Sequence, residues 1–272
     1  MKLKKSIEKA KQQRQEFIHK VSAEAPKAGG KDDGLDWISP VYSESNPIEL
    51  NLEKLALNRC ACIFPDVPEA EYYKVLRTNI QKRVRENNWN TIMITSVHPG
   101  EGKTLTSINL ALTFAKEFAQ TVLLVDCDLR RQDIHKYLDV SFDYGIVDYL
   151  VNGRPLKDLI IWPNIEKLTL ISGGKTIANS AELLGSPKMK ALVKEIKNRY
   201  EDRYIIFDVP PVFAGADAIA FSQMVDCILM VVEEGRTSIK EVKKALEMIP
   251  TEKFLGFVYN QAIASMNHYY YY

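Results

Sequence analysis

Short runs of apolar, often β-branched residues alternate with stretches of helical periodicity from residue 90 onward, and this alternation restricts the fold more than any other feature. Continuous apolar runs are typical of strands that are buried on both faces. Repeated strand–helix–strand units imply right-handed crossovers and a mostly parallel sheet. The expected strands are residues 91–97, 121–128, 167–172, 203–209, 227–234 and 254–260, and the expected helices include 103–119, 186–199 and 238–249.

The glycine-rich stretch HPGEGKT joins the first expected strand to the helix that follows it. Gly100 and Gly102 let the backbone approach phosphate oxygens, while the N–H groups of the loop and the start of the helix attract negative charge. In this setting Lys103 can reach the outer phosphates of a nucleotide, and the Thr104 hydroxyl can bind Mg²⁺. The predicted nucleotide-binding residues of the loop are Pro99, Gly100, Glu101, Gly102, Lys103, Thr104 and Leu105.

Val97 stands where the pattern GxxxxGK[ST] has its first glycine, so the match to that pattern is incomplete. A glycine-rich turn with a chance lysine is the alternative. The strand before the loop and the helix after it favour a phosphate-binding loop. We therefore predict an α/β fold with a doubly wound, mostly parallel sheet of the P-loop NTPase type and helices on both faces.

Acidic residues lie at the ends of two expected strands, which is where ligands bind in sheets of this kind. One strand ends in VDCDLRR, with Asp126 and Asp128 two residues apart and thus expected on one face. Another ends in IIFDVPP, with Asp208 after a buried run. Each aspartate alone could be a turn residue or a helix cap. Together, beside a phosphate loop, they favour metal binding or proton acceptance.

The composition and charge of the chain exclude several functional classes. The net charge is +1 over 272 residues, which does not favour nucleic acid as a partner. No apolar run is long enough to span a bilayer, and no secretory signal is visible, so we expect a cytoplasmic protein. Cys60 and Cys62 form CxC without a second cluster, which is poor spacing for zinc.

Changes in composition along the chain predict four regions. The first is rich in lysine and arginine, and its apolar residues fall near one face of a helix. This pattern fits either a solvated helix or a basic amphipathic segment that contacts anionic lipid or a partner. The second is rich in Pro, Gly, Ser and Asp, which is linker composition. The expected regions are a basic segment at 1–21, a flexible linker at 22–47, a P-loop domain at 48–264 and a tyrosine-rich tail at 265–272.

The motifs PGEGKT, LLVDCDLRR and YIIFDVPP, together with a C-terminal tyrosine cluster, resemble those of the bacterial tyrosine autokinases (BY-kinases), the cytoplasmic kinases of capsule and exopolysaccharide export systems. The resemblance covers about residues 45–272. It implies that Asn260 contacts adenine and that Arg130 lies near the phosphates or the incoming tyrosine. The catalytic residues that it implies are Lys103, Asp126, Asp128, Arg130 and Asp208, and the metal-binding residues are Thr104, Asp126 and Asp208.

The stretch EYYKVLR resembles the ExxRxxR helix through which members of this family form a ring. Glu71 and Arg77 match that motif, whereas its middle position is Lys74, which keeps the charge and loses bidentate pairing. The resemblance implies that these three residues make contacts in a homo-oligomeric ring. An ordinary charge ladder on a solvated helix is the alternative.

The resemblance also implies what the terminal tyrosines Tyr269, Tyr270, Tyr271 and Tyr272 do: they are the phosphate acceptors of an ATP- and Mg²⁺-dependent protein-tyrosine kinase, modified between subunits. It implies control of polysaccharide chain length or export. Three further expectations follow: a membrane adaptor, or polysaccharide co-polymerase, that activates the kinase; a cognate tyrosine phosphatase; and recruitment to the inner face of the plasma membrane.

Two other functions fit parts of the sequence. A ParA/MinD-like positioning ATPase would share the fold and the acidic motifs, but it typically has a lysine where this chain has His98. A non-catalytic ATP-binding scaffold is the second alternative. The presence of Lys103 and of all three strand-end aspartates argues against it.

Overall fold

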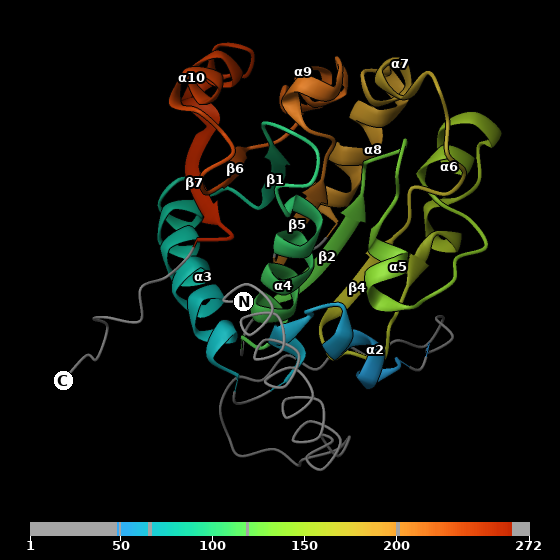
Figure 1. Ribbon diagram of the computed structural model, residues 1–272. Coiled ribbons are helices and arrows are strands. Elements are labelled where there is room, and N and C mark those ends of the chain that lie inside the picture. Colours follow the sequence, from blue (N-terminus) through green and yellow to red (C-terminus); the bar gives the residue numbers. More distant parts are fainter. Residues whose placement is uncertain (1–47, 49, 65–66, 118–119, 200–201, 263–272) are drawn as a thin grey trace, which may run out of the picture.

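The core of the structure is one seven-stranded sheet with the order β3-β4-β2-β5-β1-β6-β7, whose strands lie side by side across Figure 1. The computed structural model describes residues 48, 50–64, 67–117, 120–199 and 202–262. The predicted segment 1–21, the linker 22–47 and the tail 265–272 lie outside these residues. The strands are β1 Thr91–Ser96, β2 Thr121–Asp126, β3 Ile160–Ile161, β4 Leu168–Ile171, β5 Arg203–Asp208, β6 Cys227–Glu233 and β7 Phe254–Asn260.

All strand pairs in this sheet are parallel except β3 with β4. The six strands expected from the sequence are present, and the predicted doubly wound α/β fold is confirmed. The two-residue edge strand β3 was not expected. β2 ends at Asp126, two residues earlier than predicted, so Asp128 lies in the loop beyond the strand.

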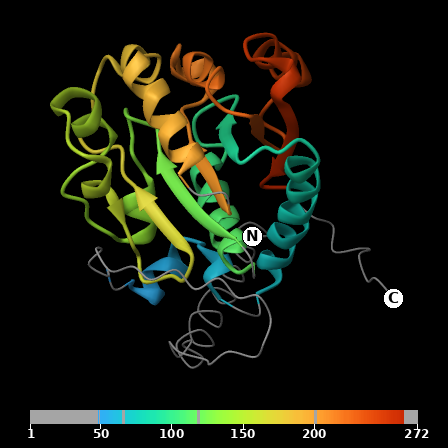
Figure 2. The ribbon, with the colours of Figure 1, turned by 180° about the vertical axis from the view of Figure 1, so that it is seen from behind.

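Helices cover both faces of the sheet, as the opposite views in Figures 1 and 2 make clear. The α-helices are α2 Leu52–Leu57, α3 Pro68–Glu86, α4 Lys103–Ala115, α5 Ile134–Leu138, α6 Ile146–Asn152, α7 Ser180–Leu184, α8 Pro187–Asn198, α9 Asp217–Ser222 and α10 Ile239–Glu247. The 3₁₀ helices are η1 Ala61–Ile63, η2 Leu156–Asp158, η3 Val212–Ala214 and η4 Thr251–Lys253. Helices α2 to α5 pack on one face and α6 to α10 on the other.

The alternation of side chains along each strand divides the core into two layers. In β1, Ile92 and Ile94 join the layer under α3 and α4, whereas Met93 joins the layer under α8 and α9. Every residue of β1, β2 and β5 is buried, which explains why the centre of each strand is continuously apolar rather than alternating.

Local sequence signals set where the main helices begin. α4 starts directly after Gly102, whose φ of 94° favours glycine. α8 starts with Ser186 as its N-cap and proline at the first helical position. α10 starts with a capping box in which Ser238 and Glu241 bond each other's backbone N–H groups. No helix among the described residues is long and apolar enough to cross a membrane.

Candidate active site

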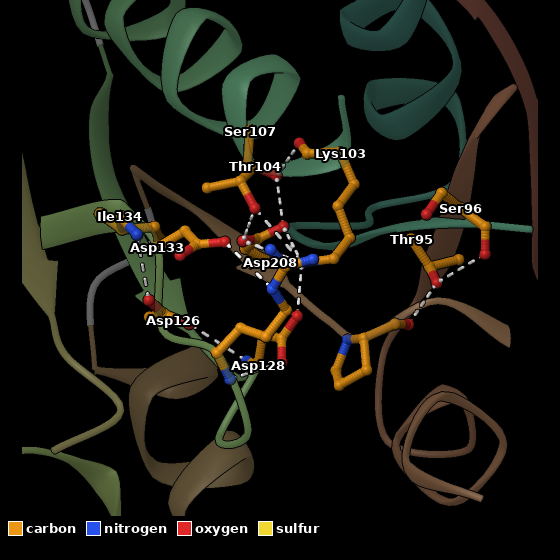
Figure 3. A network of polar contacts seen from close by, with 12 residues as sticks. Thr95, Ser96, Lys103, Thr104, Ser107, Asp126, Asp128, Asp133, Ile134 and Asp208 are labelled. Carbon is orange, nitrogen blue, oxygen red and sulfur yellow. Dashed lines mark hydrogen bonds and ion pairs between the residues drawn. The ribbon is translucent and has the colours of Figure 1, made fainter. Parts of the chain in front are cut away.

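The carboxyl ends of β1, β2 and β5 lie side by side, and the site is built where they end. Asp126 and Asp208 are direct register partners in β2 and β5, and Ile94 of β1 pairs with Asp208 on the other side. The loop between β1 and α4 folds over this edge and brings Lys103 to the carboxylates (Figure 3). The structure therefore brings together the phosphate-loop lysine and the strand-end aspartates that the sequence predicted.

Lys103 is the cation at the centre of this cluster. Its Nζ lies 2.8 Å from Oδ2 of Asp128 and 3.4 Å from Oδ2 of Asp208, and it is almost fully buried. Burial alone would lower the pKa of Lys103, but the carboxylates of Asp208 and Asp128 outweigh it and hold that pKa above its ordinary value. Lys103 is therefore charged at neutral pH, and its contact with phosphate oxygens stays a prediction.

Thr104 and Ser107 bind the carboxylate of Asp208 from helix α4. The Thr104 hydroxyl donates to Oδ2 at 2.7 Å, and the Ser107 hydroxyl donates to Oδ1 at 3.3 Å. Burial raises the pKa of Asp208, and Lys103 opposes that rise. Ser107 was not among the predicted site residues, although its position one turn after Lys103 places it on the same helix face.

The pairing of Thr104 with Asp208 suits Mg²⁺, which usually takes one or two protein oxygens and completes its shell with water and substrate phosphates. No group of three or more His, Cys, Asp or Glu side chains in the described part of the chain is arranged to hold a metal by itself.

Asp126 holds the loop that follows β2. Its Oδ1 accepts the N–H of Asp128 at 3.1 Å, and its Oδ2 accepts the N–H of Ile134 at 3.3 Å (Figure 3). Burial and the nearby Asp208 raise the pKa of Asp126 well above its ordinary value. Asp126 thus shapes the loop that carries Asp128, and its predicted metal contact stays a prediction.

Arg130 is bound to residues from α7 and α9. Its Nε donates to Oγ of Ser180 at 2.8 Å, and its Nη2 pairs with Oδ2 of the buried Asp217 at 2.9 Å. Ser180 also donates to Asp217. The contact of Arg130 with the buried pair Ser180 and Asp217 was not predicted, because these three residues are far apart in sequence. A role of Arg130 toward phosphate or tyrosine stays a prediction.

Asn260 ends β7 directly behind the phosphate loop. Its Nδ2 donates to the carbonyl oxygen of Glu101 at 2.8 Å, and a Cβ added to Gly102 would lie only 2.1 Å from that nitrogen. Gly102 is therefore required by this close approach as well as by its φ. The predicted adenine contact of Asn260 stays a prediction.

The three residues predicted to form ring contacts lie on α3 but differ in exposure. Lys74 and Glu71 pair with each other on the surface at 2.9 Å. The side chain of Arg77 is only 15% exposed, pairs with Glu117 at 2.7 Å and donates to the carbonyl of Thr113. The guanidinium of Arg77 thus fastens α3 to the end of α4, and ring contacts of all three residues stay a prediction.

The chain has relatives among known proteins, and they identify its family. The AAA domain family matches residues 89–255. The tyrosine-protein kinase YwqD of Bacillus subtilis (strain 168) is 33% identical over 76% of this chain and 87% of its own length. The chain belongs to the bacterial tyrosine kinases. Its activity is that of a protein-tyrosine kinase.

Solved structures agree with this assignment. The crystal structure of the chimerical protein CapA2B2 is 29% identical, has a TM-score of 0.67, and covers 79% of this chain and 94% of its own. MinD of Pyrococcus horikoshii, solved in complex with Mg-ADP, is 22% identical with a TM-score of 0.51 over 62% of this chain and 68% of its own, which shows a shared fold alone.

Proposed function

We propose that this kinase uses ATP and Mg²⁺ to phosphorylate the tyrosine cluster Tyr269–Tyr272 of a neighbouring copy of the chain. The observation that carries the proposal is the cluster at the sheet edge, where Lys103 contacts Asp128 and Asp208 and the Thr104 hydroxyl contacts Asp208. This cluster combines a cation for phosphate, a hydroxyl–carboxylate pair for a metal and carboxylates for proton acceptance.

The chain's own residues have separate tasks in this reaction. The loop N–H groups and Lys103 bind the phosphates, and Thr104 with Asp208 would hold Mg²⁺, which neutralises charge on the phosphates when bound. The carboxylate of Asp128 takes the proton of the tyrosine hydroxyl. The tyrosine oxygen then forms a bond to the γ-phosphorus, the bond from that phosphorus to the β–γ bridging oxygen breaks, and ADP leaves.

Asp128 suits the task of proton acceptor better than Asp126 does. Both carboxylate oxygens of Asp126 accept backbone N–H groups, which fixes this side chain in the loop. Asp128 presents its Oδ2 to Lys103, at the position where phosphates would bind. Displacement of Lys103 toward a bound phosphate would leave that oxygen free to accept a proton.

We further propose that the subunits form a ring, that transfer takes place between chains, and that a membrane adaptor recruits the kinase to the inner face of the plasma membrane and activates it. The family resemblance supports these points, as it does control of polysaccharide chain length or export and reversal by a tyrosine phosphatase.

Each phosphotyrosine adds about −1.5 to −2 charges, so four would add about −6 to −8. Repulsion of this size would favour disassembly of the ring.

Mass spectrometry of the full chain after incubation with ATP and Mg²⁺ tests the proposal. We expect phosphate on Tyr269–Tyr272 in the wild type and none in Asp208→Asn. A variant in which Phe replaces each terminal tyrosine should still bind ATP but lose the label. Tyr72→Phe, at an exposed tyrosine on α3, is the matched control and should label normally.

Two outcomes would contradict parts of the proposal. Label that persists in the variant without terminal tyrosines would place the acceptors elsewhere. Absence of any phosphotyrosine, with and without the cytoplasmic segment of an adaptor, would remove the autokinase function. A mixture of Asp208→Asn chains that have intact tails with active chains that lack acceptors tests transfer between chains, because only that route labels the inactive chain.

A further inference from the structure

Three successive carbonyl groups of the phosphate loop are bound by side chains from the C-terminal part of the chain. The carbonyl of Pro99 accepts from Arg236 at 3.0 Å, that of Gly100 from Gln261 at 3.4 Å, and that of Glu101 from Asn260 at 2.8 Å. Arg236 follows β6, Asn260 is the last residue of β7, and Gln261 follows it. Each bond joins parts of the chain at least 137 residues apart.

The direction of these carbonyls fixes the direction of the N–H groups that would bind phosphate. No peptide bond of the described chain is cis, and in a trans peptide the C=O and the following N–H point to opposite sides. Donors that bind the three carbonyls therefore turn the N–H groups of the next three residues away from Arg236, Asn260 and Gln261. A phosphate nest needs its N–H groups in that orientation.

The side chain of Glu101 adds a second attachment to the same C-terminal region. Its carboxylate is fully buried, accepts the N–H of His98 at 2.7 Å, and accepts the hydroxyl of Thr237. Arg236 is in turn oriented by an ion pair with Glu233 at 2.9 Å. The loop is thus held by a set of side chains that bind its carbonyl oxygens and the carboxylate of Glu101.

We propose that Arg236, Asn260 and Gln261 are positioning residues that pre-organise the phosphate loop, so that they set the affinity of the kinase for the triphosphate part of its substrate. The proposal rests on the ATP site proposed above and deepens it. It differs from an adenine contact of Asn260 in a measurable way. Positioning the loop affects every phosphate ligand, whereas contact with the base affects only nucleotides that carry that base.

Calorimetric binding of Mg·ATP and of inorganic tripolyphosphate with Mg²⁺ to the full chain separates these roles. We expect Asn260→Ala and Gln261→Ala each to weaken both ligands by a similar factor, about two- to tenfold, which is the worth of one neutral hydrogen bond. Arg236→Ala should weaken both ligands too, whereas Arg236→Lys, which keeps a donor, should retain most of the affinity. Gln223→Ala, at an exposed glutamine far from the loop in sequence, is the control.

The thermal midpoints of all variants are measured alongside, so that loss of folding is not taken for loss of positioning. Variants that weaken ATP but not tripolyphosphate would overturn the inference in favour of base contact. If the wild type binds both ligands and the variants bind them with unchanged affinity, the positioning inference is wrong, while the proposed ATP site stands. Failure of the wild type to bind either ligand would refute the proposed ATP site and this inference with it.

Discussion

Replacement of Lys103 by Met should destabilise the protein strongly, because it removes the cation from between buried carboxylates. At an effective dielectric constant of about 20, the Coulomb energy is about 6 kcal/mol for the 2.8 Å contact with Asp128 and about 5 kcal/mol for the 3.4 Å contact with Asp208. The cost of burying the ammonium group offsets much of this energy. Removal of one partner from a buried pair costs about 3–5 kcal/mol, and we expect Lys103→Met to fall in that range.

The loss should depend on pH, with a sign that follows from the pKa shifts. Burial raises the pKa values of Asp126 and Asp208 in the folded protein, and Lys103 partly counteracts both rises. Without Lys103, the folded variant would bind more protons than the unfolded chain above the ordinary carboxylate pKa of about 4. The stability of the variant should therefore fall as pH rises from there, so its deficit relative to wild type is smallest in acid and grows toward neutral pH.

Urea denaturation without Mg²⁺ or nucleotide, at a series of pH values from about 4.5 to 8, measures this deficit. In a separate thermal unfolding experiment at neutral pH, the expected drop in the midpoint temperature of Lys103→Met is about 10 °C for a domain of this size. Lys103→Arg, which keeps the charge, is the matched variant and should recover most of the stability. A Lys103→Met protein as stable as wild type at neutral pH, or a deficit that does not shrink in acid, would refute this account of the cluster.

Two further substitutions test the geometry around the site. Gly102→Ala should abolish ATP binding, because its Cβ would meet Nδ2 of Asn260, whereas Gly153→Ala, also at positive φ but with open space around it, should bind normally in a calorimetric titration. Asp217→Ala should cost about 2 kcal/mol in urea denaturation and slow tyrosine phosphorylation, because it leaves Ser180 and Arg130 without their buried acceptor. Unchanged stability would show that this acceptor is dispensable.

The fold was predictable because the burial of its central strands is visible in their amino-acid sequences. β1, β2 and β5 are buried along their whole length, and each has an unbroken apolar run of three or four residues at its centre, as an exposed edge strand would not. β3 was missed for the opposite reason. It consists of two half-buried residues, Ile160 and Ile161, which pair antiparallel with β4 at the edge of the sheet. Two residues are too few to show the alternation of apolar and polar side chains that predicts a strand.

The site was predictable only as far as its signals are local. Lys103 and Thr104 belong to one short motif, and Asp208 ends a recognisable strand, so the sequence alone brings them to one edge of the sheet. The donors behind the loop carry no such signature. Arg236 and Gln261 contact the loop across separations of 137 and 161 residues. Both are exposed polar residues, and nothing in their local sequence distinguishes them from other exposed polar residues.

The charges of the cluster around Lys103 are not balanced. Asp128 and Asp208 contact the single ammonium group of Lys103, and Asp126 lies beside Asp208 on the next strand. These buried residues include more carboxyl groups than cations, and burial raises the pKa values of Asp126 and Asp208. Arg130 and Asp217, by contrast, form a balanced pair. An arrangement that only stabilised the fold would be balanced in the same way. The excess of carboxylates is unfavourable for folding and becomes favourable when a cation or a proton arrives, and a metal-assisted phosphoryl transfer with a general base supplies both.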